Sequence, residues 1–201
     1  MARAAGGAAL FLLLAAPPAL PQAAGPEAAA DAVYPESIAP PPGTQYPCAL
    51  TPLPRSLPGI PEADRAYVNR TYARLLRATQ AKLLVLRAFE DLRDLRAAHA
   101  RYQDRTERLA GGLEAEAPPA GLEPFHADVR EALSLQRRFF ARGLALREAG
   151  QGMSDVYALP EARQASRRLL SAWGRMRARY PAWTPETKDS IYHHLCALDL
   201  F

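Results

Sequence analysis

Apolar and polar positions follow a helical period from residue 62 onward. Between residues 62 and 110 neither glycine nor proline occurs, and apolar side chains recur three or four positions apart. At 100° per residue, positions with this spacing share one face of a helix. That face comprises Val68, Tyr72, Leu75, Thr79, Leu83 and Leu86. The pattern predicts a long first helix over 62–110, ended by Gly111 and Gly112, which bends or projects because helices of that length are unusual.

Glycine and proline divide the rest of the chain into three shorter predicted helices. They run over roughly 123–149, 160–180 and 184–200, and Thr184 is a typical N-cap because proline follows it in the first turn. Trp173 lies in the middle of an apolar stripe, so Trp173→Ala is expected to destabilise the fold by roughly 3–5 kcal/mol if the side chain is buried, and by less than about 1 kcal/mol if the stripe faces solvent or a partner. No alternating strand pattern of useful length occurs. The sequence predicts an all-α fold, an antiparallel bundle of about four helices over 62–201.

Residues 1–24 have the composition of a cleavable signal peptide. Arg3 supplies a positive start, an apolar run over 8–16 follows, and small residues beyond it allow cleavage after Ala24 or after Ala30. The apolar run is shorter than the ~20 residues that span a bilayer. We therefore expect export to the periplasm or the extracellular space and a mature chain without a transmembrane segment. The alternatives are an alanine-rich cytosolic N-terminus and an uncleaved signal anchor.

Residues 25–61 are predicted to form a proline-rich arm between the signal peptide and the bundle. Nine prolines fall between residues 31 and 61. Because proline lacks a backbone donor and fixes φ, neither a helix nor a central strand can run there. Apolar residues such as Leu50 and Ile60 remain in the second half of the arm. We expect 46–61 to pack on the bundle and 25–45 to be mobile.

The two cysteines, Cys48 and Cys196, lie in the arm and in the last predicted helix. In an exported protein, two cysteines indicate one disulfide, which here would tie the arm to the end of the bundle. The alternative is a pair of unbonded thiols, one of them buried as a small apolar group. Because the chain has no C-x-x-C motif, thioredoxin-type exchange is not indicated.

The formal charge of the 201-residue chain is only +4, with 25 basic and 21 acidic residues. Domains that bind nucleic acid usually have a larger basic excess, so we expect no nucleic-acid partner. Arginines crowd two of the predicted helices. If those helices pack side by side, they form a surface for a protein or an anionic envelope component; otherwise they are solvated faces. The candidate residues are Arg70, Arg74, Arg77, Arg163 and Arg167.

His193 and His194 are the candidates for metal binding. Asp189 precedes His193 by one helical turn, so both side chains can reach one ion. A structural metal needs about four ligands, so the competing interpretation is one packed or capping histidine and one solvated histidine. Met176 lies on a core stripe, which favours packing over haem ligation. We predict no resident metal or cofactor.

No recognisable catalytic motif occurs, since neither a G-x-S-x-G sequence nor a cysteine beside a base is present. The main hypothesis is a non-enzymatic, exported interaction or structural protein of the cell envelope or extracellular space. The alternative is a ligand- or metal-binding bundle that uses the His193 and His194 end. A secreted helical signalling protein is a third hypothesis, prompted by the glycosylation sequon at Asn69. An enzyme whose catalytic residues are scattered along the sequence stays open.

Overall fold

The protein is all-α in the part of the chain that the computed structural model describes, residues 33–34, 38–51, 53 and 59–201. The predicted signal peptide, 1–24, lies outside these residues. The helices are α2 (Glu62–Asp91), α3 (Leu95–Glu114), α4 (Glu123–Glu148), α5 (Met153–Tyr157), α6 (Pro160–Arg179) and α7 (Pro185–Leu198). The predicted all-α bundle is therefore confirmed. Within the described residues, no helix is long and apolar enough to cross a membrane.

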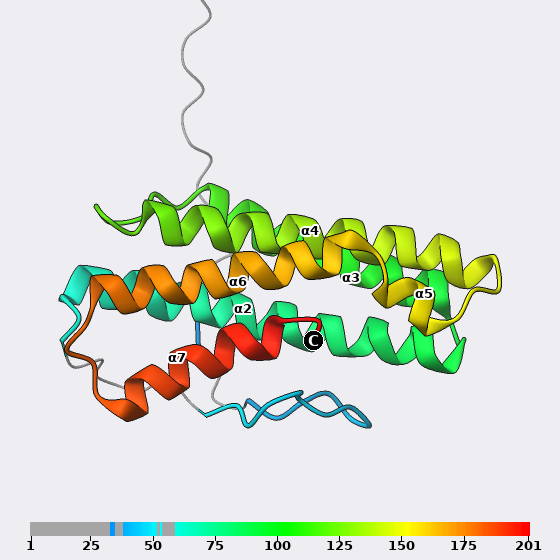
Figure 1. Ribbon diagram of the computed structural model, residues 1–201, viewed down its shortest axis with the longest axis horizontal. Helices are drawn as coiled ribbons and strands as arrows, with labels where there is room; N and C mark the ends of the chain where they lie inside the picture. The colour runs from blue at the N-terminus through cyan, green and yellow to red at the C-terminus, as the bar shows by residue number, and fades with distance from the viewer. Residues whose placement is uncertain (1–32, 35–37, 52, 54–58) are drawn as a thin grey trace, which may run out of the picture.

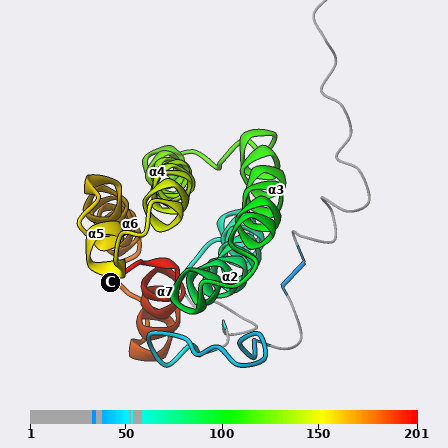
Figure 2. The same cartoon turned by 90° about the vertical axis from the view of Figure 1, so that its right-hand side faces the viewer.

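The five long helices form a closed ring around the core. Each packs on the next in the chain, α2 on α3, α3 on α4, α4 on α6 and α6 on α7, and α7 then packs back on α2. The short α5 lies between α4 and α6. Figure 1 shows the helices side by side, and Figure 2 shows the ring nearly end-on. The short connections explain the antiparallel order, because a short loop can join only neighbouring helix ends.

The segment 62–110 forms two helices instead of one. The chain reverses at residues 92–94, where Leu92 and Asp94 adopt left-handed backbone conformations with φ of 55° and 49°. Each such residue costs on the order of 1–2 kcal/mol. The reversal buries Tyr102 and Leu109 of α3, which a straight helix would carry away from the bundle. Burying two such side chains stabilises the fold by about 3–6 kcal/mol, enough to offset the strained turn.

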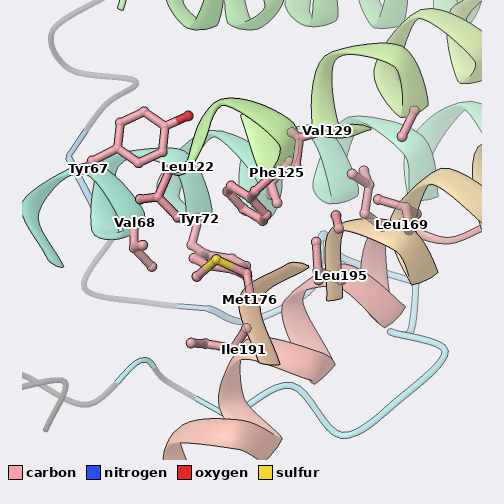
Figure 3. Close-up of a cluster of buried hydrophobic side chains, with 14 of the residues drawn as sticks. Tyr67, Val68, Tyr72, Leu122, Phe125, Val129, Leu169, Met176, Ile191 and Leu195 are labelled. Carbon is pink, nitrogen blue, oxygen red and sulfur yellow. The ribbon is translucent and has the colours of Figure 1, made fainter. Parts of the chain in front are cut away.

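The interior contains two clusters of buried apolar side chains. In the first cluster, Met176 of α6 meets Tyr72 of α2 and Leu195 of α7, as Figure 3 shows. The second cluster lies toward the turn between α2 and α3 and is aromatic, and its centre is Phe140. Trp173 is half-buried at the edge of the first cluster, where it stacks on buried Trp183 with ring centroids 6.3 Å apart. Trp173 is therefore only partly buried, because Trp183 occupies the inner position.

Gly143 in α4 permits close packing between the helices of the second cluster. A Cβ added there would lie 2.9 Å from Phe89 and 3.0 Å from Val156. We expect Gly143→Ala to lower the free energy of unfolding by about 1–2 kcal/mol, because overpacking outweighs the gain of about 1 kcal/mol in helix propensity. Gly174→Ala in α6 is the matched control, since nothing lies within 4 Å of its added Cβ. Urea unfolding should show the control slightly stabilised. Equal shifts in the two variants would contradict the packing argument.

Candidate functional site

Residues 33–34, 38–51 and 53 of the arm lie against α2 and α7 (Figure 1), and the described residues 59–61 lead into α2. Gln80 of α2 donates a hydrogen bond to the carbonyl of Ala39 at 3.3 Å, and Arg87 donates to the carbonyl of Gly43. Ser190 of α7 donates to the carbonyl of Thr51 at 3.3 Å. These contacts place Ala39 and Gly43, within the segment expected to be mobile, against α2, while the mobility of 25–45 itself stays a prediction.

Tyr34 and His194 connect the arm to the buried side of α7. The Nδ1 atom of His194 lies 2.6 Å from the carbonyl oxygen of Ser190, which can only accept, so Nδ1 carries the proton. Nε2 is then the acceptor for the hydroxyl of Tyr34, 2.8 Å away. The Tyr34 oxygen in turn accepts the backbone N–H of Leu53 at 3.3 Å. Burial lowers the pKa of His194 to about 4, so the ring is neutral at neutral pH.

Because of these contacts, His194 has no free ring nitrogen to bind a metal ion at the predicted site. Both nitrogens of His194 are engaged, while His193 is half-buried with Nδ1 3.5 Å from the Thr51 hydroxyl, and Asp189 is exposed. Among the described residues, no group of three or more histidine, cysteine, aspartate or glutamate side chains is placed to hold a metal ion. The histidine pair therefore joins the arm to α7, and the geometry favours the packing interpretation over metal ligation.

Cys48 of the arm and Cys196 of α7 interact with each other but are not at disulfide distance, so the structure does not show the predicted disulfide. Both are free thiols, and Cys48 Sγ lies 3.6 Å from the carbonyl oxygen of His193. Burial, with a further contribution from the hydrogen bond to Cys196, raises the pKa of Cys48 to about 12. The thiol therefore stays protonated at neutral pH and is a poor nucleophile. This environment is typical of a structural cysteine pair, unlike that of a catalytic thiol.

Lys82 is a buried cation beneath the last turn of α7. Its ammonium group donates to the carbonyl oxygens of Ala197 at 2.7 Å and Asp199 at 2.5 Å. These carbonyls are among those that a helix C-terminus leaves without intrahelical partners, and a cation is favourable there. Burial lowers the pKa of Lys82 to about 8. Lys82 thus attaches the end of α7 to α2 close to the cysteine pair.

The five arginines predicted to form one surface lie in separate places. Arg70 and Arg74 of α2 both pair with Glu116, beyond the end of α3. Arg163 and Arg167 are exposed on α6, which α7 and α4 separate from the α2–α3 pair in the ring (Figure 2). The structure therefore does not bring these arginines together. Glu116 neutralises part of the α2 group.

Arg77 instead lines a cleft between α2 and α3. The cleft has a volume of about 650 Å³, and its walls carry more arginines than acidic residues. Its floor includes Ala98 and the ring of Tyr102. Sequence reasoning missed this cleft because it depends on the chain reversal at residues 92–94. The sequence did contain one signal of this basic surface, since Arg101, Arg105 and Arg108 are spaced to lie along one side of the predicted helix.

Comparison with protein-family models, with curated proteins and with solved structures finds no match to this chain. A functional proposal therefore depends on the chain's own geometry. Hydrogen bonds of Tyr34, Cys48 and Thr51 hold the arm on α7, and the α2–α3 cleft offers a basic surface. Neither feature brings together a nucleophile, a base and a substrate-sized pocket.

Proposed function

We propose that the protein is a non-enzymatic interaction protein exported to the periplasm or the extracellular space, whose arm is joined to the bundle by a Cys48–Cys196 disulfide. The observation that carries the proposal is the packing of the arm on α7, where Cys48 Sγ lies 3.6 Å from the carbonyl oxygen of His193, three residues before Cys196. The two cysteines are free thiols in the structure, so the bond itself is part of the proposal. Disulfides form and persist in oxidising compartments outside the cytosol. The signal-like sequence of residues 1–24 independently supports the same location.

Structural roles of the buried polar groups support a non-enzymatic function. Asp64 accepts a hydrogen bond from the hydroxyl of Tyr180 at 2.6 Å. Asp128 accepts from Ser171 at 2.7 Å and pairs with Arg168 at 3.3 Å. Together with His194 and Lys82, these are groups that acid–base catalysis would need, and each is engaged in joining one element to another. They therefore support a scaffold that presents a surface to a partner.

The mass of the secreted protein tests the proposal. The chain is expressed with its own N-terminus in a host with an oxidising export route and is recovered without reductant. We expect a mature chain that begins near Gly25, is lighter by two protons, and yields a Cys48–Cys196 peptide pair after digestion. The Cys48→Ser variant is the control, which should be processed identically but keep Cys196 as a free thiol. An unprocessed, fully reduced chain in the cytosol would overturn the proposal.

A further inference from the structure

The α2–α3 cleft has the pattern of a groove for a third helix. From α2 it is lined at positions 77, 80, 81, 84, 87, 88 and 91, from the turn at 93 and 94, and from α3 at 98, 101, 102, 104, 105 and 108. Steps of three and four keep these positions on one face of each helix. From position 77 to position 91 the groove is ~21 Å long at 1.5 Å per residue. A helix of about fourteen residues matches that length.

Small and apolar residues form the floor of the groove. Ala81 and Ala88 of α2 and Ala98 of α3 all line the cleft, and small side chains let another helix approach closely. Leu84 lies between the two α2 alanines in the sequence and is 51% exposed. Together with these alanines it forms an apolar stripe, and a contiguous apolar surface is more informative than a single exposed residue. The groove therefore offers an apolar stripe that the described residues leave in contact with solvent.

Arginines flank this apolar floor. The groove is lined by Arg77, Arg87, Arg93, Arg101, Arg105 and Arg108, against three aspartates. Asp91 pairs with Arg87 at 3.4 Å, and Asp104 pairs with Arg108 at 2.7 Å. Because six positive charges face three negative ones, the lining residues carry an excess of three positive charges. An apolar floor between positive walls complements a helix that has an apolar stripe between acidic flanks.

We propose that the α2–α3 cleft is the docking site for an acidic amphipathic helix of a partner protein. The inference deepens the proposed interaction function and rests on it, since it names the surface and the chemistry of the partner. Leu84 would fill the space between apolar residues one turn apart on the incoming helix. Arg101 and Arg105 would pair with glutamates or aspartates on its flanks.

Fluorescence anisotropy with two designed peptides tests the docking site on the oxidised mature protein. The probe is an eighteen-residue helix with leucine and alanine on one face and glutamates on both flanks. The matched peptide carries lysines in place of the glutamates. We expect the glutamate peptide to bind at least about tenfold more tightly, with an affinity that falls as salt is raised, because charge pairs on the rim are screened.

Two substitutions separate the groove from general basic attraction. Leu84→Glu and Arg101→Glu should each weaken binding about tenfold or more. The first places a negative charge on the apolar floor, and the second reverses a positive charge on the wall. Arg163→Glu on exposed α6 is the control with the same charge change and should bind as the wild type does. Equal effects of the α2–α3 and α6 variants, or equal binding of both peptides, would overturn the docking site. So would a concentration-dependent dimer that Leu84→Glu dissociates, because a second copy would then be the occupant. Secretion and the oxidised mass are measured separately, so failure of docking leaves the export proposal standing.

Discussion

Loss of the proposed Cys48–Cys196 disulfide is expected to lower the free energy of unfolding by up to about 5 kcal/mol. The bond would close a loop that contains nearly the whole bundle, so it removes much of the freedom of the unfolded chain. Domains of this size are stable by only about 5–15 kcal/mol. We therefore expect urea unfolding of the oxidised protein to shift to markedly lower urea when a phosphine reductant is added.

The Cys48→Ser and Cys196→Ser variants provide the controls for this measurement. Each removes the bond while leaving the other thiol, so reductant should have no further effect on either variant. Both should unfold near the midpoint of the reduced wild type, since a serine at a half-buried position perturbs the folded state little. If reductant left the wild-type midpoint unchanged, either the bond does not form or the arm and α7 are held together fully by other contacts.

The helix boundaries that glycine and proline mark were accurately predicted from the sequence. The predicted helices 123–149, 160–180 and 184–200 are observed as α4, α6 and α7 with ends that differ by two residues or fewer. Gly111 and Gly112 were expected to end the helix, but α3 continues past them to Glu114. In the middle of a helix, glycine costs only about 1 kcal/mol, which packing can exceed.

The turn at residues 92–94 carries no comparable signal. Leu92 and Asp94 adopt a conformation that glycine favours, and a leucine at such a position does not mark a turn. The reversal is decided by the packing of α3 on α2 and α4, which are contacts made by residues distant in sequence. The α2–α3 groove exists only because the chain reverses. Since the sequence did not reveal the reversal, the arginines of α2 were grouped with those of α6 instead of with those of α3.

The candidate site was predictable in part. The Cys48–Cys196 disulfide was predicted from composition, since two cysteines permit only one intramolecular bond, and it stays a prediction because both thiols are free in the structure. Lys82 lies three residues after Thr79 and four before Leu86, so it was on the apolar stripe and could have been identified as a buried cation. The link between Tyr34 and His194 spans 160 residues, and no local pattern encodes such a contact. Only the fold brings it together.

Acidification from about pH 7.5 to about pH 5 is expected to cost about 2 kcal/mol of stability through His194 alone. Burial lowers the pKa of His194 to about 4 in the folded protein, whereas an unfolded histidine titrates near 6.5. Between these two pKa values the unfolded chain binds a proton at His194 that the folded protein does not bind. The free energy of unfolding therefore falls with pH, by up to about 1.4 kcal/mol per unit, until the folded ring itself is protonated.

Two variants assign this acid sensitivity to the buried ring. His194→Asn keeps a donor near Ser190 but cannot titrate, so its stability should fall about 2 kcal/mol less than that of the wild type over the same pH range. Tyr34→Phe removes the hydroxyl that bonds Nε2 while leaving the ring buried. Because burial is the main cause of the lowered pKa, Tyr34→Phe should keep the wild-type pH dependence while being less stable at every pH. Urea unfolding at several pH values measures both effects. If His194→Asn were as acid-sensitive as the wild type, another group would be responsible and His194 would be accessible to solvent in the folded protein.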